Sequence, residues 1–194
     1  MNFYYYIRFP FRDEDWIKKI LLGCVISIVP VLNLLSLCYY VECMKFGMAG
    51  RQSLPEWERW EDFVREGIIA FLISLGYLLI PLLLAFPLLH IPMVGVFLVS
   101  IIILAVGMII PLAIANYLKD HYPMDAINVK EIFYMMNRVA SNYIPAYFIA
   151  VFLMALGLTI VFLFPYLSFL GVFLIFYCGM IFFHFTGSLI NSRI

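Results

Sequence analysis

Long apolar runs alternate with short polar stretches along the chain, and this pattern predicts its elements. The last four apolar runs are each long enough to cross a bilayer as a helix at about 1.5 Å per residue. The first run, residues 20–44, is equally long but contains Pro30 and Asn33. We therefore predict four full spans and a first, proline-broken segment. The predicted spans are residues 68–89, 93–117, 144–164 and 167–190.

The polar stretch after the first apolar run has the pattern of an amphipathic helix. Ser53 and Glu56 have the spacing of a capping box. Trp57 and Trp60 fall on one arc of the helix together with further apolar side chains, and the charged side chains fall on the other arc. Such a helix beside a long apolar segment belongs at a membrane surface. We predict an interfacial helix over residues 54–66.

Two further stretches fit the same interpretation. Asn128 and Glu131 again have capping spacing, and residues 129–142 place their apolar side chains on one arc. Residues 9–19 lead into the first apolar run and contain a tryptophan and two lysines near the expected headgroup level. Both stretches are predicted to be interfacial helices.

The composition predicts a membrane protein rather than a soluble one. Hydrophobic residues make up 65% of the chain and charged residues 12%, whereas a soluble domain carries about 25% charged residues. The zero formal net charge argues against a nucleic-acid partner. The four cysteines form no C-x-x-C pair, which argues against a metal site. We expect an all-α integral membrane helical bundle, one domain over residues 1–194, with no cofactor or metal.

The placement of basic residues bears on topology. The chain has twelve lysines and arginines, and none lies in the turns near His90 and Pro165. If residues 20–44 form a fifth span, four basic residues lie on the side of the amino-terminal tail and eight on the other. If this segment is re-entrant, all twelve share one side. The positive-inside rule favours the re-entrant arrangement and predicts that the charged loops are cytoplasmic. Both arrangements stay open at this point.

With these segments placed, a set of residues spread along the chain forms a recognisable pattern. They are Trp16-Ile17-Lys18-Lys19-Ile20-Leu21-Leu22-Gly23, Ile28-Val29-Pro30, Asn33, Leu54-Pro55-Glu56-Trp57, Gly67, Tyr77 and Pro81. In these residues the chain resembles the prokaryotic, often archaeal, membrane family labelled domain of unknown function 4013. The resemblance covers essentially the whole chain and implies a multi-span membrane protein with no established catalytic residues. One departure is Leu37-Cys38-Tyr39, where the family more often has glycine before the tyrosine.

Three sets of residues are candidates for function. Tryptophans and lysines at the headgroup level are typical interfacial anchors. Acidic side chains on the polar arc of residues 54–66 could form a docking face for a protein partner. Polar side chains within apolar runs could line a path between kinked helices. The anchors are Trp16, Lys18, Lys19, Trp57 and Trp60; the docking face is Glu58, Asp62 and Glu66; the path is Asn33, Tyr77 and Asn116.

The first functional hypothesis is a non-enzymatic scaffold or accessory subunit in the cell membrane. It would present amphipathic helices on the cytoplasmic face and contact lipid, a membrane-protein partner or further copies of itself. The absence of Asp, Glu, Lys or Arg from the middle of the spans argues against an ion-coupled carrier. The alternative is a small transporter, channel or lipid-handling protein with proline-kinked helices. A third hypothesis, an intramembrane enzyme, would use His184 and Ser188; we expect no enzyme.

Overall fold

The computed structural model describes residues 7–29, 32–57, 60–91 and 94–191, except the side chains of Trp60 and Asp62. Within these ranges the chain forms helices and no strand. In order, the elements are η1 (Phe9–Arg12), α2 (Trp16–Ile28), α3 (Asn33–Met48), α4 (Trp60–Leu88), α5 (Val94–Asp120), η2 (Pro123–Ile127), α6 (Val129–Leu163), η3 (Pro165–Leu167) and α7 (Ser168–Asn191).

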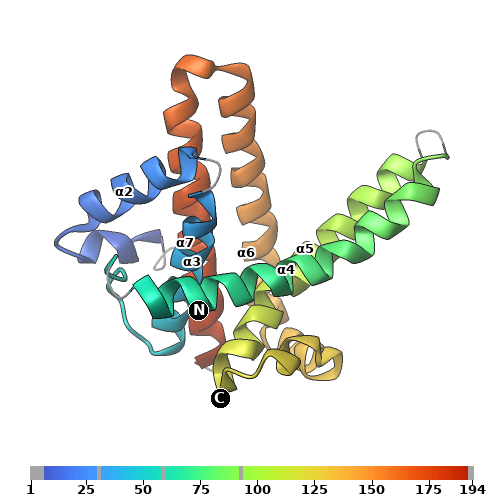
Figure 1. The fold of residues 1–194 in the computed structure, drawn as a ribbon, viewed down its shortest axis with the longest axis horizontal. Coiled ribbons are helices and arrows are strands. Elements are labelled where there is room, and N and C mark those ends of the chain that lie inside the picture. The colour runs from blue at the N-terminus through green and yellow to red at the C-terminus, as the bar shows by residue number, and fades with distance from the viewer. Residues whose placement is uncertain (1–6, 30–31, 58–59, 92–93, 192–194) are drawn as a thin grey trace.

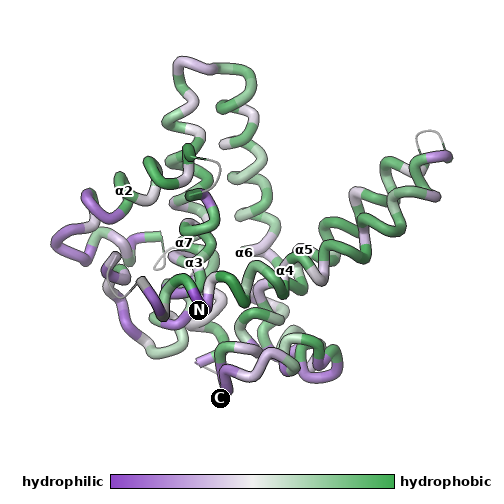
Figure 2. The backbone as a smooth tube through the Cα atoms, in the orientation of Figure 1, coloured by the Kyte–Doolittle hydropathy of each residue, from purple (hydrophilic) through white to green (hydrophobic). Residues whose placement is uncertain are grey.

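Two helical hairpins dominate the molecule. Helices α4 and α5 form one hairpin and α6 and α7 the other, and the two hairpins diverge from a shared base (Figure 1). All four helices are long and apolar enough to cross a membrane, so four helices of spanning length are present, as the sequence predicts. Figure 2 shows that both hairpins are mostly hydrophobic and that the hydrophilic segments gather mainly away from their tips. This arrangement is compatible with a multi-pass membrane protein.

The shorter helix α3 packs along α7 with almost no space between the two backbones. A Cβ atom added to Gly187 would lie 2.1 Å from the carbonyl oxygen of Met44, and one added to Gly47 would lie 2.1 Å from that of His184. Only glycine permits such an approach. On its other side, α3 meets α4 at Gly67, where an added Cβ would lie 2.0 Å from the sulfur of Cys38. The close α3–α4 contact therefore depends on Gly67.

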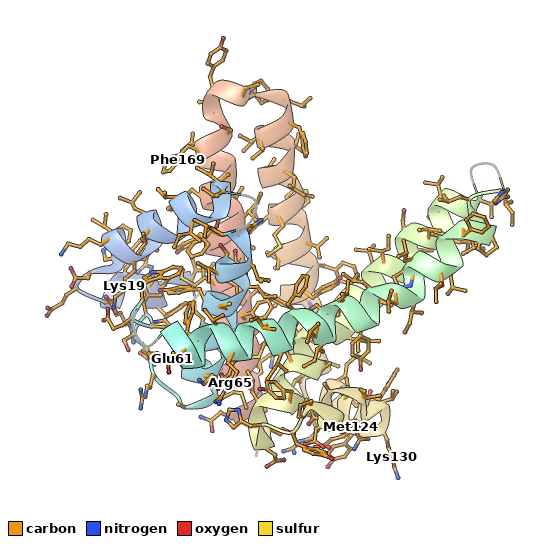
Figure 3. All side chains as sticks on the ribbon, viewed as in Figure 1. Lys19, Glu61, Arg65, Met124, Lys130 and Phe169 are labelled. Atoms are coloured by element: carbon orange, nitrogen blue, oxygen red, sulfur yellow. The ribbon has the colours of Figure 1, made fainter. Side chains whose placement is uncertain are left out.

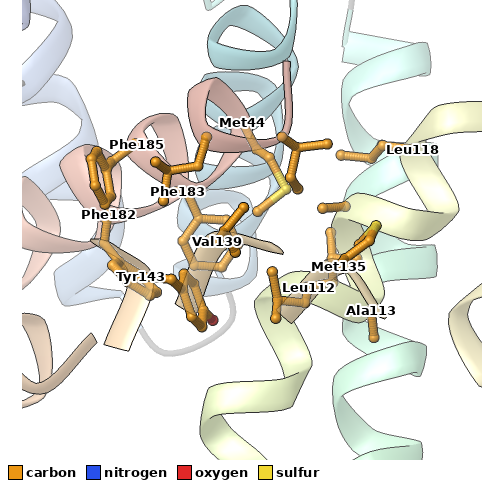
Figure 4. Packing of buried hydrophobic residues seen from close by; sticks show 14 of the residues in the cluster. Met44, Leu112, Ala113, Leu118, Met135, Val139, Tyr143, Phe182, Phe183 and Phe185 are labelled. Carbon is orange, nitrogen blue, oxygen red and sulfur yellow. The ribbon is translucent and has the colours of Figure 1, made fainter. Parts of the chain in front are cut away.

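The main core lies where α3, α5, α6 and α7 meet. Figure 4 shows Met44, Leu112, Val139, Tyr143 and Phe182 packed together from these four helices. Toward the hairpin tips, the large apolar side chains are exposed, as expected of surfaces that face lipid. Examples are Leu83, Phe86 and Phe162, with exposed fractions of 72%, 77% and 78%.

The first apolar segment is two helices rather than one. Helix α2 has 13 residues and α3 has 16, so they are about 20 and 24 Å long. Each is shorter than the hydrocarbon core of a bilayer, which is about 30 Å thick. Helix α2 ends before Val29, whose backbone is extended; Pro30 lies outside the described residues. The structure thus shows no fifth helix of spanning length among the residues it describes.

The polar stretches also differ from the predicted interfacial helices. Residues 54–57 are not helical, and the helix that follows runs unbroken from Trp60 into the span. Helix α6 is likewise continuous from Val129 through Leu163, so residues 129–142 form its first part. Helix α6 begins where the Asn128–Glu131 capping spacing predicts, because the side chain of Asn128 accepts a hydrogen bond from the backbone N–H of Glu131 at 3.3 Å. Between residues 9 and 19 lie η1 and the first turn of α2.

Candidate functional site: a locked polar face

Lys19 ties the amino-terminal segment to the loop before α4. Its ammonium group lies 2.8 Å from Asp13 Oδ2 and 2.6 Å from Glu56 Oε1, and it donates to the carbonyl oxygen of Leu54 at 3.3 Å. Asp13 Oδ2 also accepts the backbone N–H of Leu54 at 3.0 Å. The side chains of Lys19 and Asp13 are only 6% and 8% exposed. These residues, together with Trp57, are called the Lys19 clasp below.

Aromatic packing completes the clasp. Trp57 donates its indole N–H to the carbonyl oxygen of Lys19 at 3.2 Å and stacks on Tyr39, with ring centroids 4.5 Å apart. The Tyr39 hydroxyl donates to the carbonyl oxygen of Pro55 at 3.3 Å. Tyr39 lies on α3, so the clasp joins three segments that are far apart in sequence. The Trp-x-Lys-Lys and Leu-Pro-Glu-Trp stretches that carry the family resemblance are thus in direct contact.

The clasp explains why Ser53 and Glu56 do not form a capping box. In a capping box, the Glu56 carboxylate would bond back to the backbone at Ser53. Instead it bonds to Lys19, and the Leu54 N–H is taken by Asp13. A charged partner from a distant segment outweighs a local bond worth about 1 kcal/mol.

The clasp also bears on the two topologies left open by the sequence. If residues 20–44 crossed the bilayer, Lys19 and Glu56 would lie on opposite surfaces, about 30 Å apart. Their charged atoms are 2.6 Å apart. This contact favours the re-entrant arrangement over a full crossing. Helix α3 packs against α7 and α4, and a re-entrant segment needs protein around it.

A second ion cluster, centred on the buried Glu66, lies where α3, α4 and the end of α5 meet. Lys45 lies 2.9 Å from Glu42 Oε2 and 2.9 Å from Glu66 Oε2, and His121 Nδ1 lies 3.7 Å from Glu66 Oε1. The side chain of Glu66 is 7% exposed. We call these four residues the Lys45 cluster. Burial lowers the pKa values of Lys19 and Lys45, but the carboxylates around each outweigh it and raise both pKa values above normal.

The predicted interfacial anchors lie in different environments. Lys18 is fully exposed and pairs with Asp15 at 2.7 Å, whereas Lys19 is buried in the clasp and does not reach headgroups. Trp16 is half-buried and packs edge-on against Phe11. Trp57 is also held in the clasp rather than on the surface. The side chain of Trp60 lies outside those described.

The predicted docking face is not assembled as expected. We predicted that Glu66 would face a protein partner; instead it is buried against Lys45, because an isolated charge between three helices needs a counter-charge. Glu58 and the side chain of Asp62 lie outside the described residues. Across the described part of the chain, His, Cys, Asp and Glu side chains form no group of three that could hold a metal ion.

The three residues of the predicted polar path have separate roles. Asn33 is exposed at the start of α3. Tyr77 donates its hydroxyl to the carbonyl oxygen of Ala126 at 2.7 Å, and Asn116 donates its amide to that of Asp125 at 2.8 Å. Tyr77 and Asn116 therefore hold η2 against α4 and α5. The sequence pattern singled out both residues but not this function.

His184 and Ser188 bond to backbone carbonyls. His184 Nε2 lies 2.9 Å from the carbonyl oxygen of Arg51, and its ring stacks on Phe9 at 3.9 Å. Ser188 donates to the carbonyl oxygen of Phe185 at 2.7 Å. His184 thus fastens the loop after α3 and the amino-terminal segment to α7. These bonds add to the contacts that the Lys19 clasp makes with the amino-terminal segment.

Comparison with known proteins identifies a family and no characterised relative. The family model described as "Protein of unknown function (DUF4013)" matches residues 21–191. No curated protein and no solved structure matches significantly.

Proposed function

The chain belongs to the DUF4013 family, and from this membership and its four apolar helices we propose that it is a non-enzymatic scaffold or accessory subunit of the membrane. Its polar segments form one face that a protein partner recognises. The contact of Lys19 with Glu56 supports re-entry of residues 20–44. Re-entry would bring all the basic residues to one side, which the positive-inside rule assigns to the cytoplasm, so we propose that this face is cytoplasmic.

The observation that carries the proposal is the buried ion pairing of this face. The buried charges at the centres of the Lys19 clasp and the Lys45 cluster are Lys19, Asp13 and Glu66, and burial makes each of them costly without a partner. Such pairs contribute little net stability compared with apolar packing, and where buried charges are retained they can specify one conformation. A face of defined shape suits a protein that binds a partner.

The surface for that partner lies on η2 and the first turns of α6. Tyr122, Met124, Ile127 and Tyr134 are exposed by 58%, 62%, 67% and 64%, and Arg138 lies over the Tyr134 ring at 5.9 Å. Tyrosine, methionine and arginine are enriched at the centres of protein interfaces. We assign the docking role to this patch in place of the acidic residues of α4.

Site-directed photo-cross-linking in native membranes tests the proposal. Benzoylphenylalanine replaces Tyr134 in one variant and Tyr166 in the matched control. Both tyrosines are exposed, Tyr166 by 102%, but Tyr166 lies at the tip of the α6–α7 hairpin. We expect Tyr134 to give a discrete, stoichiometric protein adduct, identified by mass spectrometry, and Tyr166 to give none.

Two results would overturn the proposal. One is a chain that cross-links at Tyr134 only to lipid or to itself. The other is an equal set of protein adducts from both positions, since this would mark random neighbours rather than a docking face.

A further inference from the structure

An apolar groove runs between α4 and the η2 segment. Its volume is about 540 Å³, within the range of about 300–1,000 Å³ typical of sites for small ligands. Helix α4 contributes Ile73, Gly76 and Ile80 to its lining, and the opposite wall includes Pro123, Ala126 and Val129. Figure 3 shows Met124 and Lys130 on the segment that passes below α4. The groove lies apart from the Lys19 clasp and the Lys45 cluster.

Gly76 and Tyr77 keep this groove open. A Cβ atom added to Gly76 would meet nothing within 4 Å, so this position leaves space that a side chain would fill. The next residue, Tyr77, holds the opposite wall through its bond to Ala126, and Asn116 holds it through Asp125. Hydrogen bonds therefore fix the two walls relative to each other, while the space beside Gly76 stays unfilled.

Filling this groove with water or leaving it empty would be unfavourable. A bound water needs two to four polar partners, and the Tyr77 hydroxyl in the lining already donates to Ala126. An empty groove would deprive its apolar walls of dispersion contacts. The α4 wall belongs to a helix apolar enough to cross a membrane, so in a bilayer this wall meets hydrocarbon, whereas the opposite wall comes from η2 and the start of α6.

We propose that this groove binds one acyl chain of a membrane phospholipid. A second copy or a partner helix fits less well: a helix about 10 Å across would place only about 7 Å of its length, little more than one turn, in this volume. An extended acyl chain fills a narrow groove along its length.

Photolabelling of the full chain tests this site. The protein is reconstituted in vesicles of phosphatidylethanolamine and phosphatidylglycerol that contain phosphatidylglycerol with a diazirine on one acyl chain. After illumination, labelled peptides are mapped by mass spectrometry. We expect residues 69–80 and 123–129 to carry at least five times more label than equally exposed parts of α5.

Gly76→Phe fills the groove and Leu78→Phe is its matched control. Leu78 is 42% exposed, lies about 200° around the helix from Gly76 and does not line the groove. Gly76→Phe should reduce the groove label at least fivefold and Leu78→Phe should leave it unchanged. Gly76→Leu adds a smaller side chain and should reduce the groove label by an intermediate amount. It replaces Gly76→Phe in the test if the phenylalanine variant does not fold.

Three results would overturn the proposal. Label spread evenly over the exposed helices would mean that the lipid is only bulk bilayer. Undiminished label in folded Gly76→Phe or Gly76→Leu would place the lipid elsewhere. Protein–protein cross-links through residues 69–80, in place of lipid adducts, would assign the groove to a second copy or a partner.

Discussion

The most informative perturbation is Lys19→Met, which removes the central charge of the Lys19 clasp and keeps a side chain of similar length. Asp13 would then remain 8% exposed, with hydrogen bonds from the backbone N–H groups of Leu54 and Asp15 but no counter-charge. Glu56 is 64% exposed and would simply be solvated. The lost stability therefore comes from one buried carboxylate, Asp13, which is left without its counter-charge.

Breaking a buried ion pair from one side costs about 3–5 kcal/mol. Because Asp13 keeps two hydrogen bonds, from Leu54 and Asp15, we expect the lower end, about 3 kcal/mol. For a chain of this length, each kcal/mol corresponds to about 2–4 °C in Tm. The predicted fall in Tm is then about 6–12 °C.

Tryptophan fluorescence during thermal unfolding in detergent is the assay. The chain has three tryptophans, and Trp57 lies in the clasp while Trp16 lies beside it, so the signal reports on this region. Lys18→Met is the matched control, because Lys18 is the neighbouring lysine and its pair with Asp15 is exposed. It should leave Tm unchanged.

A double variant completes the design. Asp13→Leu together with Lys19→Met removes both buried charges, so it should be more stable than Lys19→Met alone. Equal Tm values for Lys18→Met and Lys19→Met would refute the reasoning, since the buried pair would then contribute no more than the exposed one.

Three further predictions concern other parts of the molecule. Burial lowers the pKa values of Lys19 and Lys45, but their carboxylate partners raise these pKa values above the usual 10.5. The stability that the two ion pairs give the folded protein is therefore complete at neutral pH and is lost as pH rises through the raised pKa values. Tm measured against pH should fall above about pH 10.5, and it should fall less steeply in Lys19→Met. Gly187→Ala forces a methyl group against backbone and should cost about 3 kcal/mol in thermal unfolding, whereas Gly76→Ala, in open space, should not lower Tm. Tyr77→Phe removes the hydroxyl that bonds to the carbonyl oxygen of Ala126 in η2, so it should lower the free energy of unfolding by about 1 kcal/mol. It should also speed proteolysis at η2 while leaving the Lys19 clasp intact. Unchanged proteolysis at η2 would contradict the role of Tyr77 in holding η2 against α4.

The parts of the fold that the sequence predicts are those set by local pattern. Long apolar runs predict the four spans because only a helix satisfies every backbone group in hydrocarbon. The Asn128 cap follows from spacing over one helical turn. Pro30 and Asn33 predict a break in the first apolar segment, and α2 and α3 are separate helices there.

The parts that the sequence does not predict depend on distant contacts. The capping spacing at Ser53 is overridden by Lys19, more than thirty residues away. Glu66 has the pattern of an exposed helix face, and only packing against Lys45 buries it. The i,i+3 spacing of Glu42 and Lys45 is the one local sign of that cluster.

Sidedness is the most direct test of the central claim, that the amino-terminal segment and the loops before α4 and after α5 share one side of the membrane, held there by the Lys19 clasp and the Lys45 cluster. The four buried cysteines are replaced by alanine, and single cysteines replace Lys18, Tyr134 or Tyr166, which are all exposed. An impermeant maleimide is then applied to sealed vesicles of known orientation. We predict that positions 18 and 134 are labelled from the same side and position 166 from the other. Labelling of positions 18 and 166 from one side would contradict the account, because residues 20–44 would then cross the membrane and the clasp could not form.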